Sequence, residues 1–128
     1  DISLKHEFKK YKVHTMKGEE FLKTYNSKID YIYLDAFDFD HGNHSMKRKK
    51  SYEQNMNCTI TNELCHMMHL ECCKNIINKM TDNGYICIDD ILNKDSTEGK
   101  GVLAVPFLIK NNFNQLEYYP NCIIFSKI

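Results

Sequence analysis

Tyr85-Ile86-Cys87-Ile88-Asp89-Asp90 is the stretch of this 128-residue chain that decides the fold. Uncharged residues run up to Ile88 and two adjacent carboxylates follow, which is typical of a buried parallel strand. In open α/β sheets, ligands bind in the crevice outside the carboxyl ends of the strands. We therefore expect Asp89 and Asp90 to face a ligand site.

A second segment, Ile29-Asp30-Tyr31-Ile32-Tyr33-Leu34-Asp35, has the same form: a largely apolar run that stops at an acid. If the two segments are neighbouring parallel strands, Asp35 lies beside Asp89 and Asp90 at one edge of the sheet. The functional prediction rests on this convergence.

The remaining elements follow from apolar spacing and from turn residues. Helices are expected over 19–25, 61–80 and 101–111, and further strands over 11–16, 116–119 and 122–126. Thr61 is the expected N-cap of the second helix, and Gly84 is expected to take a left-handed turn after it. Pro106 marks a kink or a late start in the third helix. Strands that alternate with helices predict an α/β fold with a mostly parallel sheet, helices on both faces and a C-terminal antiparallel hairpin.

Residues 36–59 form the least regular part of the sequence and are expected to be a long loop. Aromatic, acidic and histidine side chains are frequent in its first half, and the basic cluster Lys47–Lys50 follows. A loop of this length in a compact domain is usually a lid or binding loop, or else disordered. We interpret it as a candidate lid over a small-molecule acceptor, and the basic cluster as solvated.

The composition predicts one domain in the cytoplasm, without a nucleic-acid or membrane partner. The 17 basic and 17 acidic residues cancel, so no overall field attracts polyanions. The sequence has no signal-peptide pattern and no long apolar run. Its six cysteines fit a reduced, intracellular protein.

The histidines and cysteines of the 61–80 helix do not form the sequence pattern of a zinc site. The potential ligands Cys65, His66, His69, Cys72 and Cys73 all lie on this helix, and a single helix cannot surround a metal. We interpret them as core and surface positions.

The two acid-ended segments, with the closing hairpin, resemble the C-terminal two-thirds of class I S-adenosylmethionine-dependent methyltransferases. The closest likeness is to the metal-dependent O-methyltransferases of the catechol and macrocin type. It rests on residues 29–36 and 76–90, and on Gly99-Lys100-Gly101, which leads into a helix as the family's last helix follows its acidic pair.

The resemblance implies a partial Rossmann-like methyltransferase domain over 1–128, a three-layer sandwich that lacks the family's N-terminal glycine-rich cofactor-binding strand and loop. None of the five glycines forms that loop. We expect a piece of a longer parent chain. Two alternatives are that another polypeptide supplies the missing strands, or that the cofactor site is lost.

The resemblance also implies the site. S-adenosylmethionine would be the methyl donor, with Met16, Lys17 and Asp35 beside it. Mg²⁺ or another divalent cation, held by Asp35, Asp89 and Asp90, would orient a hydroxyl of a small acceptor such as a sugar or a phenol.

The base that takes the hydroxyl proton is expected just after Asp35. The likeness to macrocin-type enzymes points to Asp38, whereas His41 and His44 are better matched to neutral pH. The alternative reading is that these acids cap turns and these loop residues are ordinary. The domain would then be a non-catalytic Rossmann-like binding or assembly module, with homo-oligomer formation left open.

Overall fold

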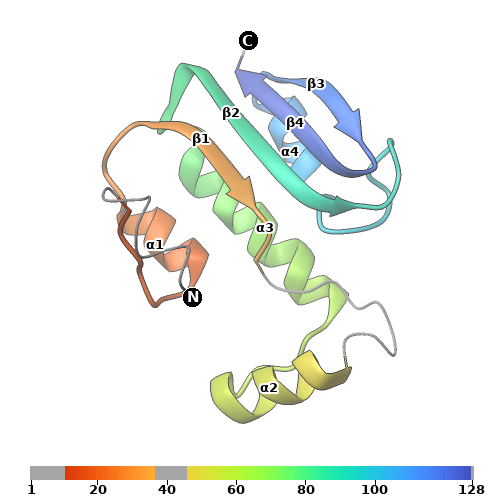
Figure 1. Cartoon of the computed structure of the whole chain (residues 1–128). Coiled ribbons are helices and arrows are strands. Elements are labelled where there is room, and N and C mark those ends of the chain that lie inside the picture. Colours follow the sequence, from red (N-terminus) through yellow and green to blue (C-terminus); the bar gives the residue numbers. More distant parts are fainter. Residues whose placement is uncertain (1–10, 37–45, 128) are drawn as a thin grey trace.

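A mixed four-stranded sheet, covered by helices on one face, forms the fold in the computed structural model, which describes residues 11–36 and 46–127 (Figure 1). The helices are α1 (Gly18–Thr24), α2 (Met46–Met56), α3 (Asn62–Ile76) and α4 (Ala104–Lys110). The strands are β1 (Ile29–Leu34), β2 (Met80–Ile91), β3 (Phe113–Tyr119) and β4 (Asn121–Lys127). The α/β class and the C-terminal hairpin are confirmed.

The strand order is β1-β2-β4-β3, and only β1 and β2 run parallel. The expectation of a mostly parallel sheet is therefore wrong. The hairpin places β4 between β2 and β3. Ile123 and Phe125 of β4 are fully buried, whereas Gln115 and Glu117 of β3 are exposed. The more apolar hairpin strand thus takes the interior position, and the polar one forms an edge.

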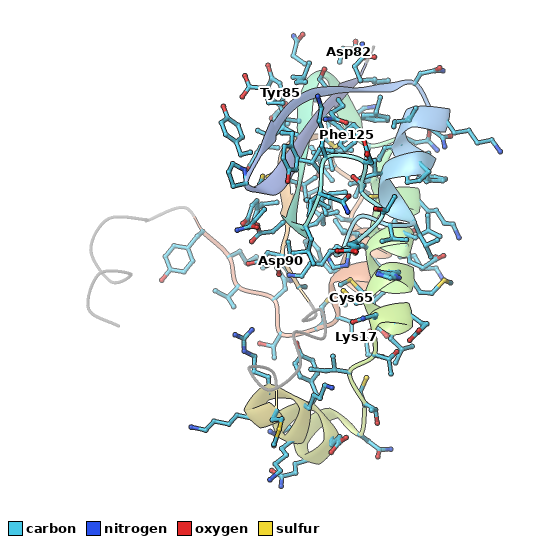
Figure 2. All side chains as sticks on the ribbon, turned by 90° about the vertical axis from the view of Figure 1, so that its right-hand side faces the viewer. Lys17, Cys65, Asp82, Tyr85, Asp90 and Phe125 are labelled. Atoms are coloured by element: carbon cyan, nitrogen blue, oxygen red, sulfur yellow. The ribbon has the colours of Figure 1, made fainter. Side chains whose placement is uncertain are left out.

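The core lies between one face of the sheet and helices α1, α3 and α4. Ile86 and Phe125 are paired across β2 and β4 and are fully buried on this face. Tyr85, one residue earlier, is 44% exposed on the opposite face (Figure 2). The described residues therefore form two layers, and the predicted three-layer sandwich with helices on both faces is not observed in them.

Helix α3 begins as predicted and ends earlier. The Thr61 hydroxyl accepts a hydrogen bond from the Leu64 backbone N–H at 3.2 Å, which confirms the N-cap. The helix stops at Ile76, and Met80 already belongs to β2.

Gly84 does not make the predicted left-handed turn, because it lies inside β2. A Cβ there would stand 3.0 Å from the Ile29 carbonyl oxygen. This glycine is needed for the close approach of β2 to β1 rather than for a helix end.

Helix α4 starts late, at Ala104, so Pro106 falls in its first turn, where a missing N–H costs no helical hydrogen bond.

Residues 11–16 do not form the expected strand: they pair with no other described strand, and Val13 is 77% exposed. Residues 46–56 of the expected loop are helix α2, so the basic cluster is helical. No helix in the described part of the chain is long and apolar enough to span a bilayer.

Candidate functional site

Two of the three predicted acids meet at the carboxyl ends of β1 and β2, and a lysine lies between them. The Lys100 ammonium is 2.7 Å from Asp35 Oδ1 and 2.9 Å from Asp90 Oδ2. It also donates to the Asp35 carbonyl oxygen at 3.2 Å. These three acceptors use all three N–H donors of the ammonium. The predicted convergence is thus confirmed for Asp35 and Asp90.

The Lys100 side chain is 1% exposed, while those of Asp35 and Asp90 are 50% and 31% exposed. Burial by itself lowers the pKa of this lysine. The hydrogen bonds and charges of Asp35 and Asp90 together outweigh burial, so the pKa is raised. Lys100 therefore stays charged at neutral pH and holds the ends of the two strands together.

The backbone at the end of β2 positions Lys100. Asp90 has a left-handed φ of 50°, and its carbonyl oxygen accepts the Lys100 backbone N–H at 3.0 Å. Gly99 has a φ of 90°, and a Cβ there would lie only 2.0 Å from the same oxygen. The chain thus returns against β2 at Gly99 and delivers the next side chain between the two acids.

Asp89 does not join this cluster. It lies two residues after Cys87 and pairs with Cys122, which places it on the sheet face away from the helices. There the Tyr33 hydroxyl donates a hydrogen bond to Asp89, which is the main reason why the pKa of Tyr33 is raised. The expected three-carboxylate group is therefore divided between two faces.

This arrangement does not fit a bound Mg²⁺. A buried ammonium already occupies the position between Asp35 and Asp90 and neutralises one of their two charges, and Asp89 is turned away from them. Within residues 11–36 and 46–127, no group of three or more His, Cys, Asp or Glu side chains is arranged to hold a metal. In this chain the cation between the strand ends is Lys100.

Two adjoining cavities open at the carboxyl end of β1. The smaller cavity has a volume of about 220 Å³. It is lined mainly by apolar side chains, and also by the polar residues Asp35 and His69. The larger has a volume of about 430 Å³ and is lined by Met16 and Lys17 at the start of α1 and by α3 residues. Both are lined by Gly18, Ala36 and Met68, which makes them neighbours. All three residues predicted to lie beside the cofactor therefore border this pair of cavities.

Apolar side chains of α3 face the larger cavity instead of the core. Leu64 and Met67 are 45% and 47% exposed, and both line the cavity. Figure 2 shows Lys17 close to the N-terminal half of α3, where Cys65 is labelled. An exposed apolar wall beside a cavity is typical of a small-molecule site.

His69, which the sequence indicated to be an ordinary position of the 61–80 helix and not a ligand, is among the residues that line the smaller cavity. It is fully buried on α3, and its Nδ1 lies 2.8 Å from the Cys65 carbonyl oxygen. Because a carbonyl can only accept, Nδ1 carries the proton and Nε2 carries a lone pair. Nε2 has no hydrogen-bond partner among the described residues. Burial is the main cause that lowers the pKa of His69, to about 4, so the ring is neutral at physiological pH.

The cysteines of α3 are core residues. Burial raises the pKa of Cys72 to about 12 and also raises that of Cys73, so both are protonated thiols at neutral pH. This agrees with their interpretation as core positions. The expected base residues Asp38, His41 and His44 lie outside the described residues.

Comparison of this chain with protein families, with curated proteins and with solved structures found no match. The site itself is therefore the basis for assigning a function to this chain.

Proposed function

We propose that this chain is the acceptor-binding part of an S-adenosylmethionine-dependent O-methyltransferase that acts on a hydroxyl of a small molecule. The observation that carries the proposal is the meeting of Asp35 and Asp90 at the carboxyl ends of two parallel strands, beside two apolar cavities. Ligands of α/β sheets bind at this edge. A parallel pair with acidic ends, followed by a closing hairpin, is also the pattern on which the methyltransferase resemblance rests.

The two cavities suit two ligands that must touch. The larger one, with Met16 and Lys17 in its wall, would receive part of the cofactor, and the smaller one would receive the acceptor. Asp35 lines the smaller cavity and is half-exposed, so it can accept a hydrogen bond from the acceptor. When bound, S-adenosylmethionine supplies an electrophilic methyl group, while the acceptor oxygen gives its proton to a base. Alignment of the two reacting atoms supplies much of the rate.

In this proposal Lys100 replaces the divalent cation of the resembling enzymes as the positive charge between the strand ends. It keeps Asp35 in place and limits the negative charge next to the acceptor oxygen. The base would come from Asp38, His41 or His44, and residues 36–59 would act as the lid. Methyl transfer would then be independent of Mg²⁺.

A second candidate is a non-catalytic binding or assembly module with a Rossmann-like origin. The sequence favours it in one respect, because none of its five glycines forms a phosphate- or cofactor-type glycine loop. The sheet face that carries Tyr31, Tyr33 and Tyr85 is also exposed in the described part of the chain.

Calorimetric titration of the full-length gene product with S-adenosylmethionine separates the two candidates. The methyltransferase proposal expects saturable heat, unchanged when EDTA replaces Mg²⁺ in the buffer. A folded protein that gives no heat with S-adenosylmethionine would overturn it in favour of the binding module. Heat that requires Mg²⁺ would overturn the role given to Lys100.

A further inference from the structure

The outer side of β1 is an open sheet edge that lacks the usual protection. β1 is one of the two edge strands, and no described strand pairs with its outer side. The other edge strand, β3, has an exposed charge at Glu117 and a bulge between Gln115 and Glu117, and both features hinder pairing with another chain. β1 pairs regularly with β2 from Tyr31 to Leu34, and this stretch has no charge and no proline. Such an edge is a template for a further strand.

Helix α1 extends the helix layer past this edge. It packs on α3, and Figure 1 shows it beyond β1, on the side away from β2. A groove of about 500 Å³ lies between the two elements, and every described residue of its lining belongs to α1, to β1 or to the turn that connects them. Phe21, Tyr25 and Ile32 contribute partly buried rings and apolar side chains to its wall. The position beside β1 therefore has an apolar floor and no described strand above it.

The backbone of β1 turns the N–H and C=O groups of alternate residues toward this groove. At the start of β1, the Ile29 N–H donates to the Lys79 carbonyl, directly before β2. After its end, the Asp35 carbonyl accepts from Lys100 beside β2. These odd-numbered positions face β2, so the N–H and C=O groups of Ile32 face the opposite way. The backbone of another extended segment is the complement of this edge.

We propose that this groove binds an extended segment of another polypeptide, which adds to the four-stranded sheet as a further strand beside β1. Its alternate side chains are apolar, because they cover Phe21, Tyr25 and Ile32. Lys28 lines the groove next to the start of β1, so the segment carries an acidic residue at that end. This interaction goes beyond the proposed methyl transfer and does not depend on it.

A second copy of this chain is a poorer occupant of the groove. Pairing of two β1 edges about a two-fold axis would bring the α1 helix of the partner into the layer beneath β1. Side chains of α3 already fill that layer, where Met68 lines the smaller cavity together with Ile32 and Leu34. A single extended segment brings no helix with it and avoids this overlap.

The peptide acetyl-Glu-Val-Thr-Val-Thr-Val-Lys-amide is a suitable probe. Its valines share one face when it is extended, and its glutamate is placed to meet Lys28. Titration into the ¹⁵N-labelled chain is followed by NMR. We expect saturable shifts of the Ile32 and Leu34 amides and slower hydrogen exchange of the Ile32 amide, because its N–H gains a partner.

Two N-methylated forms of the peptide separate strand addition from general apolar contact. Methyl groups on the valine nitrogens block one edge of the extended peptide, and methyl groups on the threonine nitrogens block the other. Strand addition uses a single edge, so only one form should lose affinity, by about tenfold or more. Which form loses affinity shows whether the added strand is parallel or antiparallel to β1.

Ile32→Pro and Ile32→Val are the matched variants of the edge. Proline at an outward-facing position of an edge strand keeps the hydrogen bonds to β2 and removes the N–H that meets the partner. Peptide binding should be lost in Ile32→Pro and retained in Ile32→Val. If Ile32→Pro does not fold, the two N-methylated peptides decide the question on the wild-type chain alone.

The inference is overturned by a peptide that does not bind, by equal affinities of the two N-methylated forms, or by unchanged binding to folded Ile32→Pro. A dimer of the chain that Ile32→Pro dissociates in sedimentation would overturn it in favour of a second copy. An Ile32 amide protected in the full-length gene product alone would overturn it in favour of a segment of the same polypeptide. None of these measurements involves S-adenosylmethionine, so this inference and the methyltransferase proposal can fail separately.

Discussion

At the scale of single residues, Lys100 determines what the acidic strand ends can do. A lysine side chain that is 1% exposed stands between two carboxylates, and its position turns an apparent metal site into an internal ion cluster. The arrangement is stable only as a whole, because each acid depends on the same ammonium.

Lys100→Met tests this cluster. It keeps most of the buried stem and removes the charge, so Asp35 and Asp90 would face each other uncompensated. We expect a loss of about 2 kcal/mol in the free energy of unfolding, below the roughly 3–5 kcal/mol found for fully buried pairs, since both acids are partly exposed. Urea denaturation measures it, and the exposed Lys94→Met should change stability by less than about 0.5 kcal/mol. Equal effects of the two variants would contradict the structural role of Lys100.

His69 gives the stability a definite pH dependence. Its pKa is about 4 in the fold and about 6.5 in the unfolded chain. Between these values the unfolded state binds one more proton, so stability falls as the pH drops from about 6.5 to about 4. The contribution of His69 amounts to about 3 kcal/mol over this window.

Urea denaturation at several pH values checks the sign and the source of this effect. The slope of the wild type in this window should be reduced in His69→Leu. A variant of the exposed His14, such as His14→Gln, should retain the slope. An unchanged slope in folded His69→Leu would show that His69 is not buried as a neutral ring.

At the scale of elements, the turn that follows β2 is as important as the strand itself for placing Lys100 between the two acids. The left-handed Asp90, the bridge between Ile91 and Gly99 and the bond from the Lys100 N–H to the Asp90 carbonyl form one closed backbone unit. The site therefore depends on two elements that end in acids and on one loop that returns between them.

Gly99→Ala should break this unit. The φ of 90° is strained for alanine, and its Cβ would stand 2.0 Å from the Asp90 carbonyl oxygen. We expect a loss of about 3 kcal/mol in stability, measured by thermal and urea denaturation. Gly18→Ala is the matched control: nothing lies within 4 Å of its Cβ, and alanine at the start of α1 should be neutral or stabilising by about 0.5 kcal/mol. Similar losses in both variants would mean that backbone geometry at Gly99 is not the cause.

At the scale of the whole molecule, β2 and β4 carry a pair of cysteines on the sheet face away from the helices. The sulfurs of Cys87 and Cys122 are 2.9 Å apart, and the residues are separated by 35 positions in the chain. Burial is the main cause that raises the pKa of Cys87 to about 12, so the thiol is protonated at neutral pH. The pair is therefore stable as two thiols, yet close enough to be joined.

Incubation with glutathione disulfide at pH 9 should join Cys87 and Cys122 by thiol–disulfide exchange, with release of two glutathione molecules and a mass loss of 2 Da. The disulfide would close a 35-residue loop, which should stabilise the fold by roughly 3–4 kcal/mol through the unfolded state. Peptide mapping and urea denaturation measure both effects. Cys87→Ser should show neither, and a disulfide between other cysteines would contradict the predicted pairing.

Local sequence patterns predicted most elements correctly. The runs that end at Asp35 and Asp90 became β1 and β2, Thr61 capped α3, and Pro120-Asn121 joined the hairpin. These features depend on apolar spacing and on turn chemistry, which the sequence contains. The strand expected over 11–16 failed, because a strand requires a neighbour and the local pattern does not supply one.

By itself, the sequence determined that two apolar runs end in acids and favour strands, because residue type and spacing are local properties. Only the tertiary structure decided that these strands pair in parallel, and what lies between their ends. Lys100 is 65 residues from Asp35 in the chain, and no local pattern distinguishes its buried ammonium from that of a solvated lysine. The same holds for His69, whose free lone pair follows from what surrounds it in space and not from its neighbours in sequence.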